Sequence, residues 1–265
     1  MRDTLLPAAL AATVLWPVAL FSQTPTLTCD RSSGWGDGER VCEIREIPIT
    51  SRPQLSVDGG TNGGIRIRGW DRDETRLWVR VEAHARSESR AHDLLDQVDI
   101  RTGGTVRADG PSGRNREWWS VSYELFVPRG TDLDLETLNG GVRVSDVQSR
   151  VRFSVTNGGV HLSNLGGDVS GRTTNGGVVL ELSGDSWTGT GVDVATTNGG
   201  VRVVVPDHYN AHLITGTVNG SLNFDFPVTV QGRLNRRLEA DLGSGGTSIR
   251  AVTTNGSVSV RRAGT

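Results

Sequence analysis

The triplet Asn-Gly-Gly recurs five times in this chain, and each copy opens a short run of alternating apolar residues. Two degenerate Asn-Gly-Ser copies follow toward the C-terminus. A period near 20 residues is typical of a repeat architecture, in which each unit buries its apolar side only against its neighbours. The asparagines that mark the predicted structural turns are Asn62, Asn139, Asn157, Asn175, Asn198, Asn219 and Asn255.

Each repeat predicts about two short strands. After one turn, Val142 and Val144 alternate with Arg143, as expected for a strand with one buried side. The alternation returns before the next turn at Val151, Phe153 and Val155. Neither strand is large enough to bury its own apolar row, so we expect the repeats to stack in parallel register about 4.8 Å apart. Stacking would align Asn139, Asn157, Asn175 and Asn198 at one corner, edged by Thr156, Thr173, Thr174, Thr196 and Thr197.

The fold class that follows is all-β: a parallel β-solenoid, resembling a right-handed β-helix, with one short inserted helix. The right-handed coil is preferred because parallel connections are right-handed in nearly all proteins. An antiparallel hairpin array remains the alternative, since Asn-Gly also favours two-residue hairpins. We further expect the Asn-Gly-Gly turns to use left-handed backbone, which glycine and asparagine tolerate.

The N-terminus predicts an export signal at residues 1–22. An apolar run from Leu5 to Phe21 follows a single arginine, and Pro7 and Pro17 interrupt it. The run is short for a membrane span. We therefore expect export to the periplasm or cell surface, with no stable membrane span after signal cleavage; an uncleaved anchor is the alternative.

Two cysteines remain behind this signal, Cys29 and Cys42. An even pair in an exported protein predicts a disulfide. It would staple a polar, loop-rich lead-in at residues 23–40. A metal site is disfavoured because two further ligands are missing nearby.

The remaining chain divides into two predicted regions. Residues 41–131 read as an N-terminal β region, and residues 132–265 as the regular repeats. The inserted helix is predicted near residues 87–98, where apolar residues recur at helical spacing and Ser87 or Ser89 supplies an N-cap. Because one repeat, at Asn62, lies in the first region, we expect one continuous β structure.

The sequence predicts no catalytic centre, cofactor or metal. The net charge is −2 and every basic residue is arginine, which gives no field to attract nucleic acid. The five histidines have no metal or catalytic spacing. Asp132, Asp134 and Glu136 alternate on one side of a strand, where they could bind a cation; we expect instead a solvated face that discourages end-to-end stacking of strand edges. The tryptophans at 70, 78, 118, 119 and 187 are expected to pack rather than to bind sugars.

The repeats, together with the segment from Val57 to Ile65 and the following Gly69-Trp70-Asp71, resemble the bacterial putative-adhesin family. These are exported domains of unknown function built from β-strand repeats with Thr-Asn-Gly turns. The resemblance, over about residues 41–262, implies an all-β solenoid, export and no catalytic residues.

The expected function is therefore that of a non-enzymatic, exported protein of the cell envelope. It would act through surface or protein interaction, with an envelope protein or a polysaccharide as partner. The alternative is a carbohydrate-binding or carbohydrate-cleaving β-helix protein, whose cleaving form would need a carboxylate cluster or an arginine and carboxylate groove along one face.

Overall fold

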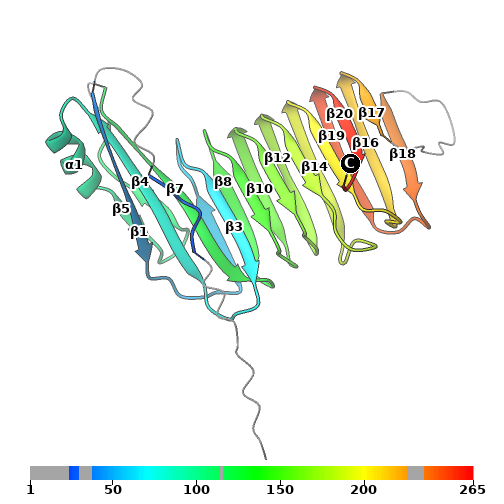
Figure 1. The fold of residues 1–265 in the computed structure, drawn as a ribbon, viewed down its shortest axis with the longest axis horizontal. Helices are drawn as coiled ribbons and strands as arrows, with labels where there is room; N and C mark the ends of the chain where they lie inside the picture. The colour runs from blue at the N-terminus through cyan, green and yellow to red at the C-terminus, as the bar shows by residue number, and fades with distance from the viewer. Residues whose placement is uncertain (1–23, 30–37, 114–115, 226–235, 265) are drawn as a thin grey trace, which may run out of the picture.

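A computed structural model describes residues 24–29, 38–113, 116–225 and 236–264. Each repeat forms a flattened coil with one strand in each of two long sheets, which lie face to face (Figure 1). Parallel pairs predominate, as predicted. The spatial order of sheet A is β1 (Glu39–Ile47), β4 (Arg76–Ala85), β7 (Trp118–Pro128), β3 (Ile65–Trp70), β9 (Val142–Ser145), β11 (Val160–Ser163), β13 (Val178–Glu181), β15 (Val201–Val205), β20 (Val258–Arg262) and β17 (Leu222–Phe224).

Sheet B has eight strands and supplies the other half of each coil. Its order is β18 (Arg237–Leu242), β16 (Ala211–Asn219), β19 (Ser248–Asn255), β14 (Gly191–Asn198), β12 (Asp168–Asn175), β10 (Val151–Asn157), β8 (Asp132–Thr137) and β2 (Gln54–Asp58). Only β18 runs antiparallel to its neighbour. The coil of β2 and β3, which contains Asn62, stacks on that of β8 and β9, so the two predicted regions share one β structure.

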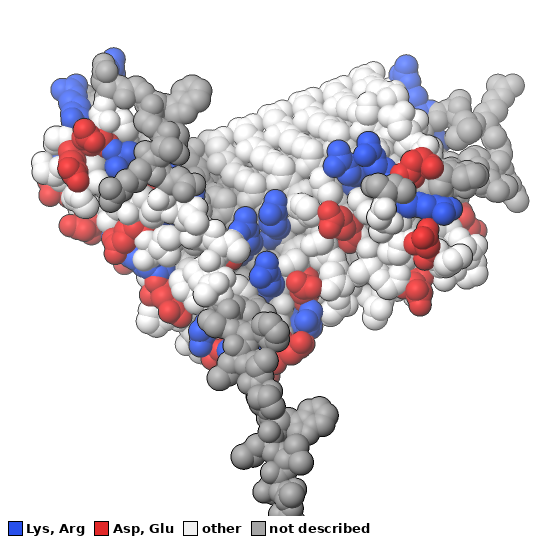
Figure 2. Space-filling model, in the orientation of Figure 1, with Lys and Arg blue, Asp and Glu red and all other residues white. Residues whose placement is uncertain are grey.

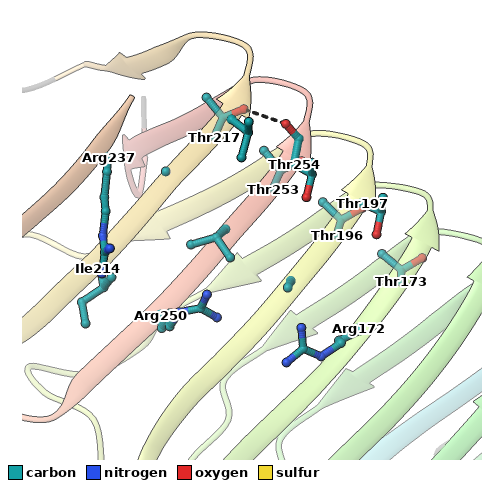
Figure 3. Close-up of a pocket in the computed structure, with 14 residues that line it drawn as sticks. Arg172, Thr173, Thr196, Thr197, Ile214, Thr217, Arg237, Arg250, Thr253 and Thr254 are labelled. Atoms are coloured by element: carbon teal, nitrogen blue, oxygen red, sulfur yellow. Dashed lines mark hydrogen bonds between the residues drawn. The ribbon is translucent and has the colours of Figure 1, made fainter. Parts of the chain in front are cut away.

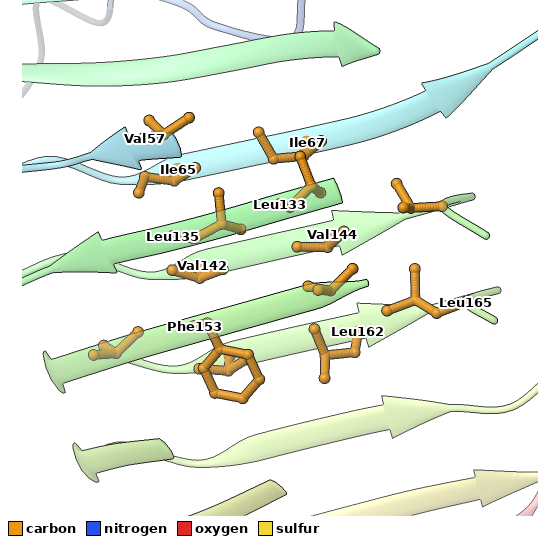
Figure 4. Packing of buried hydrophobic residues seen from close by; sticks show 14 of the residues in the cluster. Val57, Ile65, Ile67, Leu133, Leu135, Val142, Val144, Phe153, Leu162 and Leu165 are labelled. Carbon is orange, nitrogen blue, oxygen red and sulfur yellow. The ribbon is translucent and has the colours of Figure 1, made fainter. Parts of the chain in front are cut away.

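The core lies between the two sheets and consists of columns of aliphatic side chains (Figure 4). One column joins Val144, Leu162, Leu180, Val203 and Val260, which are register partners on successive strands and completely buried. Each buried side chain contributes roughly 1.5–3 kcal/mol. The column explains why strands of four residues suffice, since each coil completes the core of the next.

The order of the last coils differs from the order of the chain. β19 lies between β14 and β16, and β20 lies between β15 and β17. Asn255 therefore stacks between Asn198 and Asn219. In chain order, β16 and β17 come directly after β14 and β15, but in space they lie one coil farther along the stack. β18 pairs with the outer side of β16, and β19 and β20, the last strands of the chain, occupy the coil between.

The N-terminal end of the stack departs from the solenoid. There β1, β4 and β7 form an antiparallel end of sheet A. The helix α1 (Glu88–Asp96) packs on β4 and β1 through Ala91, Leu94 and Leu95. Its N-cap is Ser87, whose hydroxyl accepts a hydrogen bond from the Arg90 amide at 3.3 Å. The small hairpin of β5 (Asp99–Arg101) and β6 (Arg107–Asp109) follows, and Val106 beside it pairs with Val57.

The side chains of the seven asparagines form a continuous ladder at one corner. Asn157 donates to Asn139 and accepts from Asn175, both at 2.7 Å. The ladder runs on to Asn198 (2.9 Å) and Asn255 (2.8 Å). Inward threonines support the corner by donating to glycine carbonyls of the adjacent turn, as Thr173 does to Gly158 at 2.8 Å.

The expected left-handed backbone of these turns is wrong. No residue of the five Asn-Gly-Gly turns has a positive φ. The first glycine is required by close packing instead: a β-carbon on Gly158 would lie 2.0 Å from the Gly140 carbonyl oxygen of the preceding coil. Positive φ values occur at the opposite corner, at Asp146 and Asn164, where the Asn164 amide donates to the Asp146 carboxylate at 2.6 Å.

Asp134 and Glu136 are exposed, as expected for a solvated face, but the expected protection of a sheet edge is wrong, because β8 is not an edge strand. It pairs with β2 on one side and β10 on the other. The pKa of Asp132 is held below its usual value, mainly by a hydrogen bond from the Ser149 hydroxyl. A hydrogen bond from the Arg150 backbone amide and the positive charge of the Arg150 side chain lower it further. The carboxylate thus joins neighbouring coils.

The structure joins Cys29 to Cys42 in a disulfide, with the two Cα atoms 5.7 Å apart. The bond ties the lead-in to β1. The predicted signal at residues 1–22 and most of residues 30–40 lie outside the described residues. Within the described ranges, α1 is too short and too polar to cross a membrane.

Candidate functional site on the outer face of sheet A

The second glycine of each Asn-Gly-Gly turn faces outward and leaves a side-chain-free strip across sheet A. Gly64, Gly141, Gly159 and Gly177 follow one another on adjacent coils, linked by hydrogen bonds such as that from the Val142 amide to the Gly159 carbonyl at 3.0 Å. Together with flanking side chains they line a groove with a volume of about 730 Å³. The groove is open along the stack, which suits an extended ligand.

Basic side chains border this strip. Arg66, Arg143 and His161 are register partners on β3, β9 and β11, so they lie one strand apart in a row. Among the described residues, neither Arg66 nor Arg143 has a carboxylate within ion-pair distance, and His161 lies 3.0 Å from Glu181. No carboxylate lines the described part of the groove. Figure 2 shows basic side chains in the middle of this view, below a strip of the repeats that carries no charge.

The lead-in forms a wall at the N-terminal side of the groove. Glu124, only 1% exposed, accepts hydrogen bonds from the amides of Thr26 (2.8 Å) and Leu27 (3.1 Å). Arg80 donates to the Thr28 carbonyl at 3.2 Å. Because the disulfide fixes the next residue, Cys29, the position of this wall depends on the bond.

A second hollow, of about 360 Å³, lies on the outer face of sheet B (Figure 3). Its threonines line up at the ends of neighbouring strands, with Arg172 and Arg250 farther along. Arg250 donates to Asp193 at 2.5 Å, so part of its charge is already balanced. The sheet A groove has the larger of the two volumes, and its two arginines without an ion pair among the described residues, Arg66 and Arg143, are direct register partners on adjacent strands.

A carbohydrate-cleaving enzyme would need its carboxylates close together, but the four candidates, Asp146, Asp168, Glu181 and Asp193, lie apart. Glu181 meets His161 on sheet A, whereas Asp193 meets Arg250 on sheet B. Asp146 lies at the corner with Asn164, and Asp168 begins β12. In the described part of the chain, no three His, Cys, Asp or Glu residues form a metal-binding group.

Sequence reasoning missed His212 as a member of an acidic cluster. Its ring lies 2.7 Å from Asp241 and 3.3 Å from Glu239, both on β18. The hydrogen bond to Asp241 is the main cause that raises the pKa of His212. No motif signals this contact, because β18 reaches β16 by folding back.

The tryptophans mostly pack, as expected. Trp70 and Trp78 lie against Phe126 at ring distances of 5.4 and 5.5 Å, and Leu27 of the lead-in covers them. Trp187 is buried and donates to the Gly167 carbonyl at 3.0 Å. Trp118 is 39% exposed and stacks on His84.

Sequence reasoning also missed Arg66 and Arg80 as groove residues. Arg66 follows its Asn-Gly-Gly asparagine by the same number of positions as Arg143 and His161 do. Aligning the repeats would have shown a shared outward row. Arg80 carries no such signal, since it lies on β4 in the antiparallel end of sheet A, outside the repeats.

A family model described as Toastrack DUF4097 matches residues 98–261, well over half of the chain. The chain belongs to this family. The match covers every regular coil from β8 onward and confirms the resemblance drawn from the repeats. A comparison with curated proteins finds no match for this Toastrack chain.

Several solved structures are similar to this Toastrack protein. One, from Clostridium sporogenes, is called a putative cell adhesion protein: it is 11% identical, with a TM-score of 0.44 over 85% of this chain and 100% of that chain. A putative adhesin from Bacteroides fragilis is 10% identical, with a TM-score of 0.35 over 84% and 97%. A putative lipid binding protein from Parabacteroides distasonis is 15% identical, with a TM-score of 0.32 over 84% and 96%.

Proposed function

We propose that this Toastrack protein is an exported, non-enzymatic component of the cell envelope that works by binding through the outer faces of its stacked coils. The observation that carries the proposal is the groove of sheet A, where a row of basic side chains borders a strip without side chains. Stacked repeats commonly present extended binding surfaces of this kind.

Three further observations support the proposal. The disulfide between Cys29 and Cys42 fits an oxidising compartment. The carboxylates Glu181 and Asp193 already face His161 and Arg250 on opposite sheets, which is poorly suited to paired acid and base catalysis. The names of the similar proteins from Clostridium and Bacteroides point to adhesion as well.

The test is to fractionate cells that produce the tagged full chain and then to cross-link intact cells. We expect the protein in the envelope fraction, oxidised at both cysteines, and cross-linked to an envelope protein or polysaccharide. A cytoplasmic protein with two free thiols would contradict the proposal. So would reproducible polysaccharide turnover by the purified protein that a single substitution at Asp146, Asp168, Glu181 or Asp193 abolishes.

A further inference from the structure

We propose that the groove of sheet A binds a linear polysaccharide that carries carboxylates, and that Arg66 and Arg143 are its two anion contacts. This inference rests on the proposed function, because it names the ligand of the same outer face. The ligand would lie along the stack, from the lead-in wall at Thr26–Thr28 toward His161.

The charges of the groove favour an anion. Arg66 and Arg143 are direct register partners on adjacent parallel strands, about 4.8 Å apart along the sheet. Like charges placed opposite each other destabilise a sheet. On its other side, Arg66 is the register partner of the buried Glu124, which accepts hydrogen bonds from the Thr26 and Leu27 amides and forms no ion pair with Arg66. No carboxylate lines the described part of the groove. A bound carboxylate would remove this repulsion, and the guanidinium groups could donate to it in pairs.

At Gly64 and Gly159 the floor of the groove has room for a side chain, whereas a β-carbon on Gly141 would lie 3.3 Å from the Gly159 carbonyl oxygen, which is a tighter contact. A β-carbon on Gly159 would lie 3.6 Å from the Gly177 carbonyl oxygen, which is ordinary contact. The last two coils carry Ser257 and Ser221 at the equivalent position, in register with the glycines. Serine therefore fits this position, and the glycines of the earlier coils keep the floor flat next to the arginines.

The backbone of the floor favours a polysaccharide over a peptide strand. The Gly141 and Gly159 carbonyls already accept the amides of Ile65 (2.9 Å) and Val142 (3.0 Å). The strands β3, β9 and β11 lie within sheet A, so they offer no free edge to which a peptide strand could add. A linear polysaccharide has no side chains that would need pockets, so it can lie on the flat glycine floor. Its regularly spaced carboxylates can then contact the arginines at the border.

The experiment measures binding of the purified, oxidised chain to polygalacturonate, a linear carboxylated polysaccharide. Neutral dextran and poly-glutamate serve as comparison polymers. We expect binding to polygalacturonate alone, weakening as salt increases. Arg66→Gln and Arg143→Gln should each weaken it about tenfold, since each removes charge-assisted hydrogen bonds. Arg152→Gln, an exposed arginine on β10 of sheet B, should stay within about twofold of the unchanged protein.

A third variant tests the floor. Gly159→Leu fills the groove and leaves both arginines in place, so it should also lose binding. The melting temperature of each variant identifies any that fail to fold. If Gly159→Leu fails to fold, Arg66→Gln still tests the inference on its own. Unchanged binding by Arg66→Gln and Arg143→Gln, no binding by the unchanged chain, or equal binding of poly-glutamate or dextran would each overturn the inference.

These outcomes are separate from those of the proposed function. An envelope protein that cross-links to a partner, yet whose arginine variants bind polygalacturonate normally, overturns the ligand assignment alone. A cytoplasmic location overturns the proposed function, while the binding measurement still decides whether the groove recognises carboxylates.

Discussion

Gly158 lies so close to the preceding coil that a β-carbon on it would stand 2.0 Å from the carbonyl oxygen of Gly140. The adjacent Gly159 has no such contact, since its nearest atom would be 3.6 Å away. Two neighbouring glycines of one turn therefore differ in their structural role. The first sets the spacing of the coils, and the second leaves the outer face open.

This difference gives a matched pair of variants. Gly158→Ala should lower the free energy of unfolding by about 3 kcal/mol or more, because the coils must separate to admit the methyl group. Gly159→Ala should change it by less than about 1 kcal/mol. Urea unfolding of both variants provides the measurement. Equal losses would show that the two glycines have the same role.

The asparagine ladder predicts a dependence on position. Asn157 makes two side-chain hydrogen bonds, to Asn139 and Asn175, whereas Asn219 at the end of the ladder makes one, to Asn255. At about 0.5–1.5 kcal/mol for each bond, Asn157→Ala should cost roughly twice as much as Asn219→Ala. Thermal unfolding compares them. Equal costs would mean that the side-chain ladder does not stabilise the stack.

Local patterns were enough to predict most of the fold. The alternation at Val142 and Val144, repeated at a fixed distance after each Asn-Gly-Gly, led to strands, stacking and the ladder, and helical spacing before Val98 led to α1. The backbone of the turns was not predictable in this way. Asparagine and glycine tolerate left-handed φ, but here the first glycine is needed because a side chain would collide with the backbone of the neighbouring coil. A single repeat does not reveal that contact.

Contacts between distant segments were also beyond the sequence. The sequence pattern of β19 does not show that it lies between β14 and β16. Asn255 would continue the asparagine ladder equally well if β19 were the last strand of the stack. The wall formed by Thr26 over Glu124 joins residues 98 positions apart. Of the candidate site, repeat alignment could have found Arg66 beside Arg143, whereas the lead-in wall required the structure.

The pH dependence of stability should involve His212. Its contacts with Asp241 and Glu239 raise its pKa, so the folded protein holds the proton more tightly than the unfolded chain. The stabilisation is fully present below the unfolded value of 6.5 and is lost as pH rises through the folded pKa above it. Because the group is partly exposed, the effect should stay under about 1 kcal/mol.

Urea unfolding between about pH 6 and pH 8.5 tests this contribution. The unchanged protein should lose stability over this range relative to His212→Gln, whose stability should be flatter with pH. Two parallel curves would show that the cluster does not hold a proton in the folded state.

The inserted coil predicts how the C-terminal half depends on the last residues. Among the strands that the structure describes, β17 pairs only with β20, and β16 is joined to the rest of sheet B only through β19. Deleting residues 244–265 removes both β19 and β20. It should therefore release β16, β17 and β18, although all three remain in the chain, while the coils from β8 to β13 keep their partners.

Hydrogen exchange resolved by segment measures this dependence. In the shortened chain, amides of residues 211–219 should lose their protection and those of residues 151–180 should keep it. Val260→Asp, which places a charge in the buried column, should loosen the same segment, whereas Ser259→Asp on the outer side of the same strand should not. If residues 211–219 stay protected after the deletion, the coil of β16 and β17 can dock directly on β14 and β15. The final coil would then be an addition to a stack that is already stable without it.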